Sequence, residues 1–174
     1  MVSLAVALLA WRRRSVPGGV YFSLMMLAAA EWSVAAAMEA ASADQNIKII
    51  WSQISYVGIS VVPTLLVFFA FSYWRPDVRI RRIYQALLWI IPLVTIIIAA
   101  TNGLHHLLWG SFTPDSQNTR ILIYGHGAWF WINVTYSYVL MFASIILLIR
   151  VAIGFPRLYR RQALAVLAAA VLPL

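Results

Sequence analysis

The basic residues of this chain are grouped, and long apolar stretches separate the groups. Of the thirteen lysines and arginines, only Lys48 and Arg120 lie outside three clusters. The clusters are Arg12, Arg13 and Arg14; Arg75, Arg79, Arg81 and Arg82; and Arg150, Arg157, Arg160 and Arg161. Each apolar stretch between clusters is long enough to cross a bilayer twice. Short loops rich in Lys and Arg stay cytoplasmic, so the pattern predicts a multi-pass membrane protein with residues 12–14, 75–82 and 150–161 in the cytoplasm.

The composition agrees with a membrane protein. Apolar residues make up 63% of the chain and charged residues only 10%, far from the usage of soluble domains. The net charge of +8 would suit nucleic-acid binding. However, the arginines flank apolar spans and form no stripe on a soluble surface, which argues against a nucleic-acid partner. Anionic lipid headgroups are the expected partners of the arginine clusters. Without cysteine, disulfides and thiolate metal sites are excluded.

The pattern of spans and turns predicts an all-α fold, a transmembrane helix bundle whose N-terminus lies outside. The expected helices are residues 1–11, 17–43, 49–74, 83–100, 126–149 and 162–174. The first and last are too short to cross a hydrocarbon core of roughly 30 Å, so both ends are expected to lie within helices of a longer chain. Residues 44–48 are expected to form a short outer turn, and residues 101–125, rich in turn formers, a longer outer segment.

Glu31 is the most unusual residue of the expected spans. It falls near the centre of span 17–43, where an ionised carboxylate is costly and acids are usually functional or paired. It is either a protonated side chain bonded to a neighbouring helix or a ligand- or proton-coupled site. Glu39 lies two turns nearer the outside, where a structural or loop-pairing role is favoured. The many alanines of this span predict that it is central to the bundle.

Span 49–74 contains three further candidates for a binding site or switch. Gln53 and Tyr56 are polar residues within an otherwise apolar stretch. Pro63 removes a backbone hydrogen bond and is expected to kink the helix. A kink beside polar side chains suits a cavity or hinge, and it is equally common in helices that only pack.

Span 126–149 has a polar side that includes Asn133 and Tyr136. We expect this side to face Glu31 and span 49–74. Buried polar side chains between membrane helices hydrogen-bond to one another, so both residues join the candidate ligand-binding or switch residues.

Three histidines are expected near the outer surface: His105, His106 and His126. Three imidazoles could bind zinc or act as a pH sensor. However, His105 and His106 are adjacent in sequence, no cysteine assists them, and Asp115 is the nearby acid. Interfacial hydrogen bonding is therefore favoured, and no metal site is predicted.

The sequence contains no catalytic constellation. It has no Gly-rich phosphate loop, no paired carboxylates and no Ser/His/Asp set on a soluble frame. Lys48, the single lysine, is expected in the outer turn, so the spans offer no lysine for a retinal Schiff base. This chain is therefore not expected to be an enzyme, and the sequence identifies no cofactor.

Three motifs, in order along the chain, resemble the N-terminal seven-helix sensor domain of bacterial histidine kinases. The first, WSQISYVG at residues 51–58 with VP and FAFSY downstream, is similar to the third-helix signature of that family. The second, TNGLHHLLW at 101–109, resembles its outer-loop pattern TN..H.L.W. The third, YGHGAWFW at 124–131 with YSY downstream, resembles its fifth-helix entry. Glu39 stands where the family often has an acid on its second helix.

This resemblance implies a seven-helix input module in the bacterial cytoplasmic membrane, with its N-terminus outside. In the family the last helix normally feeds a cytoplasmic output, commonly a PAS domain followed by a dimeric kinase and sometimes a diguanylate cyclase. ATP-binding and phospho-accepting residues, and the homodimer contact of the output region, would then lie beyond Leu174. The family's ligands are mostly undefined, so the expected stimulus is an unidentified small molecule or lipid.

The favoured hypothesis is a sensory module in which a stimulus in the outer half changes helix packing around Glu31 and Pro63. The alternative is a transporter or channel component with Glu31 as a proton or cation site. Coupled transporters often contain paired broken helices, and a single prolyl break in span 49–74 argues against one. A third possibility is a structural subunit of a membrane complex. A kinase or cyclase tail after residue 174 would distinguish the sensor from the others.

Overall fold

The computed structural model describes residues 2–12, 14–115 and 121–154 as a helix bundle with a small β-hairpin. Its elements are α1 (Val2–Arg12), α2 (Gly19–Ala41), α3 (Gln45–Trp74), α4 (Arg82–Ala100), α5 (Asn102–His105), β1 (Trp109–Pro114), β2 (Leu122–His126) and α6 (Ala128–Gly154). Among the described helices, α2, α3, α4 and α6 are long and apolar enough to cross a membrane. The helix expected at 162–174, and Arg157, Arg160 and Arg161, lie outside the described residues.

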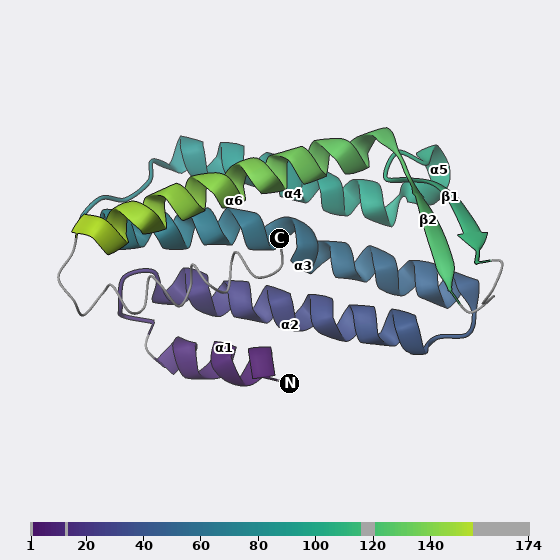
Figure 1. Ribbon diagram of the computed structural model, residues 1–174, viewed down its shortest axis with the longest axis horizontal. Helices are drawn as coiled ribbons and strands as arrows, with labels where there is room; N and C mark the ends of the chain where they lie inside the picture. Colours follow the sequence, from purple (N-terminus) through teal and green to yellow (C-terminus); the bar gives the residue numbers. More distant parts are fainter. Residues whose placement is uncertain (1, 13, 116–120, 155–174) are drawn as a thin grey trace.

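Helix α3 lies at the centre of the bundle (Figure 1). It packs against α2, α4 and α6, while α1 packs against α2. In its most apolar stretch 61% of the residues are buried, against 22% or less in α2, α4 and α6. The prediction that span 17–43 is central is therefore wrong. Ala28 of α2 lies in close contact with Gly58 of α3, whereas other small residues of α2, among them Ala36 and Ala37, are exposed, as is Val34.

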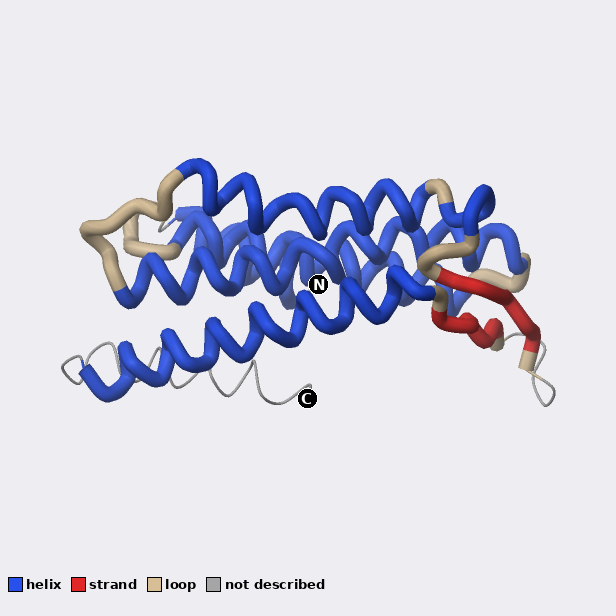
Figure 2. Tube along the Cα trace, turned by 90° about the horizontal axis from the view of Figure 1, so that it is seen from above, coloured by secondary structure: helices blue, strands red, loops and turns tan. Residues whose placement is uncertain are grey.

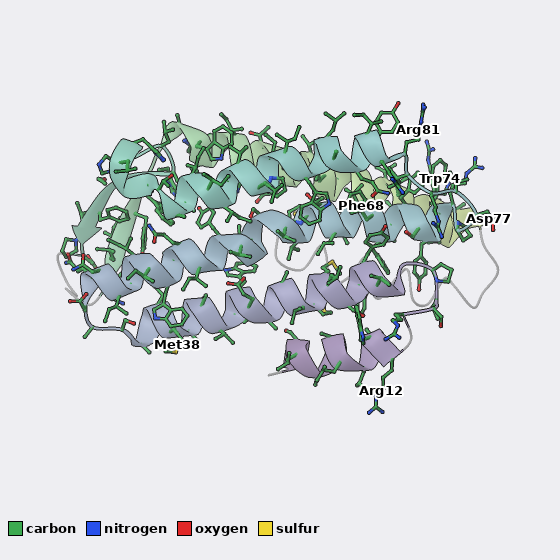
Figure 3. The ribbon with its side chains drawn as sticks, turned by 180° about the vertical axis from the view of Figure 1, so that it is seen from behind. Arg12, Met38, Phe68, Trp74, Asp77 and Arg81 are labelled. Atoms are coloured by element: carbon green, nitrogen blue, oxygen red, sulfur yellow. The ribbon has the colours of Figure 1, made fainter. Side chains whose placement is uncertain are left out.

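The two ends of the bundle differ in chemistry. Figure 2 shows β1 and β2 at one end of the long helices, which we call the hairpin end. The opposite end, which we call the arginine end, contains the exposed arginines of the described residues: Arg12, Arg14, Arg75, Arg79, Arg81, Arg82 and Arg150. In Figure 3, Arg12 and Arg81 lie toward this end and Met38 lies toward the other. The basic clusters that are far apart in sequence thus gather on one side, as the charge pattern requires.

The turn between α2 and α3 is shorter than the sequence pattern indicates. It comprises residues 42–44, because Asp44 caps α3: its Oδ1 accepts a hydrogen bond from the Ile47 backbone N–H at 3.1 Å. Aspartate is among the preferred N-cap residues. Lys48 therefore lies in the first turn of α3 and is only 6% exposed, so its expected place in an outer turn is wrong.

The outer segment 101–125 contains regular structure that the sequence analysis does not predict. After the short helix α5, β1 pairs antiparallel with β2, with Phe112 opposite Tyr124 and an irregularity at Gly110. Aromatic and β-branched side chains, which favour strands, occur on both sides of this hairpin. His126, expected at the start of the fifth span, belongs to β2 instead.

Helix α6 begins and ends later than the expected span 126–149. It runs from Ala128 to Gly154, so Arg150 lies on the helix and not in a loop. An exposed arginine in the last turns of an apolar helix can extend its guanidinium toward the membrane surface. The expected spans 1–11, 17–43, 49–74 and 83–100 agree with α1, α2, α3 and α4 to within a few residues.

Prolines lie inside two of the described helices, Pro63 in α3 and Pro92 in α4, and both are buried. A proline inside a helix removes one backbone hydrogen bond and clashes with the preceding turn. The ribbon of α3 changes direction about halfway along its length in Figure 1. From the sequence, a single helix interrupted by proline is expected, and this is wrong because Pro92 interrupts a second one. The number of interrupted helices therefore no longer argues against a transporter.

Replacing Gly58 of α3 with Ala is expected to push α2 away from α3. The added Cβ would lie 2.4 Å from the Ala28 carbonyl oxygen and 2.6 Å from Glu31 Oε2. Overpacking of this kind costs about 1–3 kcal/mol, so the unfolding temperature in detergent should fall. Gly103→Ala is the matched control, because nothing lies within 4 Å of its added Cβ. Equal unfolding temperatures for the two variants would contradict the close contact.

Candidate functional site

Glu39 connects three elements at the hairpin end. Its Oε1 accepts a hydrogen bond from the Tyr124 hydroxyl of β2 at 2.6 Å, and its Oε2 accepts one from the Ser52 hydroxyl of α3 at 3.0 Å. Its backbone oxygen, in the last turn of α2, accepts a bond from Lys48 Nζ at 2.9 Å. A cation is favourable at a helix C-terminus. One residue thus joins α2, α3 and the hairpin.

The Tyr124 phenol stays protonated in this arrangement, so it can donate a hydrogen bond to Glu39. Burial raises the pKa of its phenol well above the ordinary value of 10.0. Glu39 raises this pKa further, both by accepting the hydrogen bond and by repelling a phenolate, while Ser52 acts in the opposite direction. Because the neutral phenol persists at physiological pH, the bond to Glu39 persists as well.

Asn102 organises the loop that leads into the hairpin. Its side chain is 1% exposed, and its Oδ1 accepts bonds from the backbone N–H groups of Leu108 at 2.9 Å and Trp109 at 3.0 Å. Its Nδ2 donates to the Trp109 carbonyl at 3.0 Å. A buried backbone group without a partner is costly, so one asparagine satisfies three such groups.

The indole of Trp109 lies inside the protein, where it connects the hairpin to α3. It is 3% exposed and meets the Tyr56 ring edge-to-face, with ring centroids 5.2 Å apart. It also packs against Phe112 and Tyr124. Tyr56, a candidate ligand residue in the sequence analysis, is thus part of an aromatic cluster at the hairpin end.

Buried polar contacts connect α6 to α4. The Thr95 hydroxyl of α4 donates to Asn133 Oδ1 at 3.3 Å and accepts a bond from Trp129 Nε1 at 3.0 Å. Further along α6, the Tyr136 hydroxyl donates to the Leu88 carbonyl of α4. These contacts correct the expectation that Asn133 and Tyr136 face Glu31, because their hydrogen-bond partners lie on other helices.

Tyr136 also connects α6 to the central helix. Its hydroxyl lies 3.3 Å from Thr64 Oγ1 of α3, and Thr64 is fully buried. Thr64 follows directly after the intrahelical Pro63, so a polar contact and a missing backbone hydrogen bond occur at the same level of α3. A movement of α6 would therefore reach α3 at this level of the bundle.

Glu31 does not join the contacts of Glu39 or of α6. It lies near the middle of α2, and neither carboxylate oxygen has a side-chain hydrogen-bond partner among the described residues; the backbone of Gly58 on α3 is the polar group nearest to it. A cavity of about 310 Å³ borders it, with an apolar lining that includes Leu4 of α1 and Trp51 of α3. Gln53 of α3 is half-buried, and its side chain makes no hydrogen bond within the described part of the chain.

The histidines have separate local roles. His105 Nδ1 accepts a bond from the Leu107 N–H at 3.1 Å, and its Nε2 lies 3.0 Å from Thr101 Oγ1. His106 has a left-handed backbone, with φ of 53°, and ends α5. The His126 ring lies against Phe130. Within residues 2–12, 14–115 and 121–154, no three His, Asp or Glu side chains are placed to hold a metal ion.

The whole chain, residues 1–174, matches the family model for the N-terminal 7TM region of histidine kinase. The chain belongs to this family. No curated protein and no solved structure matches it. Family membership and the long apolar helices together make this 7TM region a multi-pass membrane protein. Such a region is a sensory input module and not itself the catalytic part of a kinase.

The outer-loop motif of the 7TM region now has a structural explanation. In TN..H.L.W, the Thr101 and His105 side chains contact each other, Asn102 holds the loop backbone, and Trp109 enters the aromatic cluster. From the sequence, Asn102 is part of this motif and a turn former, but its side-chain hydrogen bonds are not predicted. Tyr124 and Thr95 have no local signal for their roles, because their partners are distant in sequence.

Replacing Asn102 with Ala is expected to loosen the α5–β1 loop. The variant leaves two N–H groups and one carbonyl without their partner, at about 1–3 kcal/mol for each buried group that stays unsatisfied. Amide hydrogen exchange of residues 102–113, measured by mass spectrometry, should become faster. Asn102→Asp keeps the acceptor oxygen and should have a smaller effect. Unchanged exchange in both variants would refute the role of Asn102.

The Tyr124–Glu39 bond is expected to contribute its full stabilisation below pH 10 and progressively less as pH rises toward the raised pKa of Tyr124. The folded-state pKa of Tyr124 is raised, so its contribution is complete below the ordinary value of 10.0 and declines as pH rises beyond it. Tyr124→Phe should cost about 1.5–3 kcal/mol at neutral pH, the usual value for a bond to a charged group. Above pH 10 the native protein should lose stability relative to this variant. Parallel pH profiles of unfolding would contradict the assignment.

Proposed function

We propose that this 7TM region receives a stimulus at its hairpin end and passes it to a cytoplasmic histidine kinase. The hairpin end then lies outside the bacterial inner membrane, and the arginine end lies in the cytoplasm. The gathering of the exposed arginines at one end supports this orientation, because arginine-rich loops stay cytoplasmic. The output region beyond residue 174 would supply the catalytic residues and the homodimer contact.

The Tyr124–Glu39 hydrogen bond is the observation that supports this proposal most directly. It joins the hairpin to the end of α2 across 85 residues of sequence. A ligand or lipid that competes for either group, or that presses on the hairpin, would change how the hairpin is held against α2 and α3. Such a stimulus shifts the protein only if it binds two packings with different affinity.

Helix α6 is the element best placed to transmit such a change. It begins two residues after β2, and the Trp129 N–H in its first turn donates to the Leu107 carbonyl of the α5–β1 loop at 2.9 Å. The Gly127 N–H donates to the Leu108 carbonyl, also at 2.9 Å. The first turn of α6 therefore moves with the hairpin. From there the helix runs to the arginine end, bonded on the way to α4 and α3.

Lipid headgroups are proposed to hold the arginine end at the cytoplasmic surface. The guanidinium of Arg75 lies 5.0 Å above the Trp74 ring, and that of Arg14 lies 5.4 Å above Trp11. Tryptophan prefers the headgroup level, so these pairs would sit where anionic phosphates are found. Each such arginine attracts an anionic surface by roughly 1 kcal/mol.

A transporter or channel is the second candidate, and one observation favours it. Buried prolines interrupt two adjacent helices, Pro63 in α3 and Pro92 in α4. Paired broken helices surround the substrate sites of many transporters. Membership of the histidine kinase 7TM family favours the sensor. No feature of the described residues specifically supports the third candidate, a structural subunit of a membrane complex.

Tyr124→Phe in the full-length protein is expected to change kinase output. Loss of a bond that couples two parts of a protein typically shifts an equilibrium by about 1–3 kcal/mol, so basal autophosphorylation should change roughly fivefold or more. Tyr138→Phe is the matched control: Tyr138 is 46% exposed on α6, and its hydroxyl makes no hydrogen bond with another described residue. Autophosphorylation in proteoliposomes measures both variants. If neither differs from the native protein, the hairpin does not control output.

A further inference from the structure

The carboxylate of Glu31 is sealed between α2 and α3. The residue as a whole is half-buried, but its two oxygens have essentially no accessible surface and no side-chain partner among the described residues; the backbone of Gly58 is the one polar group close to them. Gly58 of α3 makes this close approach possible, because a Cβ there would lie 2.6 Å from Glu31 Oε2. The same Cβ would meet the Ala28 carbonyl and the Trp32 Cβ. The backbone of α3 thus covers the acid directly.

An ionised carboxylate is strongly disfavoured in such a place. A charge removed from water needs an opposite charge or several hydrogen-bond donors, and the described surroundings of Glu31 offer neither. At mid-membrane depth lipid cannot supply them. A protonated carboxylic acid carries no net charge, and its transfer from water costs far less.

We infer that Glu31 is a proton-binding site: it holds a proton while α2 is packed on α3, and release of that proton separates the two helices at Gly58. In the release step the O–H bond of the carboxylic acid breaks, the electron pair stays on the carboxylate, and the proton passes to water. Because the packed state binds the proton and the separated state exposes the carboxylate, proton concentration and helix packing are linked.

The other titratable groups on the helices that pack here lie away from Glu31. They are Arg12 on α1, Tyr21 and Glu39 on α2, and Lys48, Tyr56 and Tyr73 on α3. Glu39 is eight residues along α2, or about 12 Å, and is bonded to Tyr124, Ser52 and Lys48 at the hairpin end. Tyr56 packs against Trp109. Arg12 lies toward the arginine end in Figure 3. None of these groups offers Glu31 a compensating charge.

The cavity beside Glu31 is the nearest space for the water that an ionised carboxylate requires. Its volume of about 310 Å³ exceeds what a single water molecule needs. Its lining is otherwise apolar, from Leu27, Val34 and Ile54 among others. A movement of α2 away from Gly58 would expose the carboxylate to this cavity. The proton is thus a ligand class that suits the site without any further side chain.

Proton binding by Glu31 does not depend on the proposed function. Only the idea that the proton acts as a stimulus for signalling rests on it. Proton binding and helix separation can be measured on the chain itself, without a kinase. Signalling by the full-length protein is a separate measurement, so the two proposals fail on different results.

Infrared spectroscopy of the chain in lipid nanodiscs tests proton binding. At neutral pH the native chain should show the C=O stretch of a protonated carboxylic acid. This band should disappear in Glu31→Gln and remain in Glu39→Gln, the matched control that removes a different acid. A spectrum without the band, or a band that Glu31→Gln leaves unchanged, would overturn the inference.

Spin-label distances test the link to helix packing. The chain has no cysteine, so labels can be placed at Ala37→Cys on α2 and Val57→Cys on α3, both exposed positions. Raising the pH until the infrared band is lost should lengthen this distance in the native background but not in Glu31→Gln. Loss of the band at constant distance would overturn the link. If both effects occur but Glu31→Gln leaves kinase output unchanged, the proton site stands and its role in signalling fails.

Discussion

The polar groups buried on α3 must find partners inside the bundle, because lipid offers none. Helix α3 carries more buried polar side chains than a lipid-facing helix could accept, among them Ser52, Ser55, Ser60 and Thr64. Some of these bond to the backbone of α3 itself, as Ser55 does to the Ser52 carbonyl. Others bond to neighbouring elements, and those bonds determine which helices surround α3. The positions of α2, α6 and the hairpin follow from this requirement.

Two levels of α3 provide these partners in different ways. At the hairpin end, Ser52 shares the Glu39 carboxylate with Tyr124, so a loop and two helices depend on one acid. Deeper in the bundle, Thr64 meets Tyr136 of α6 beside Pro63. Between these levels Gly58 brings α2 so close that the Glu31 carboxylate is covered by the α3 backbone and has no side-chain partner among the described residues. The α2–α3 contact is therefore well bonded at both levels and poorly satisfied between them, which is where two alternative packings would differ.

The sequence predicts the membrane spans well, because charge and hydropathy act locally and each span is long. It also identifies Glu31 and Glu39 as the acids to consider, since a carboxylate within an apolar span is unusual wherever its helix packs. The hydrogen-bond partners of these acids cannot be predicted in the same way. Tyr124 is 85 residues from Glu39, and nothing in its own neighbourhood indicates the bond. The short strands β1 and β2 could not be predicted either, because each has only a few residues between turn formers and so shows little hydrophobic periodicity. Asn102 is an intermediate case, in which the motif was visible but its hydrogen bonds were not.

The central claim is that the hairpin end controls the arginine end through α6 and α3. The most direct measurement is a spin-label distance at the arginine end, between Asp77 in the α3–α4 loop and Ile153 near the end of α6, each replaced by cysteine. Ile153 is 82% exposed and accepts a label without disturbing the packing. We predict that Tyr124→Phe, which acts only at the hairpin end, shifts this distance distribution relative to the native chain. An identical distribution in both, with the hairpin released from Glu39, would contradict the account.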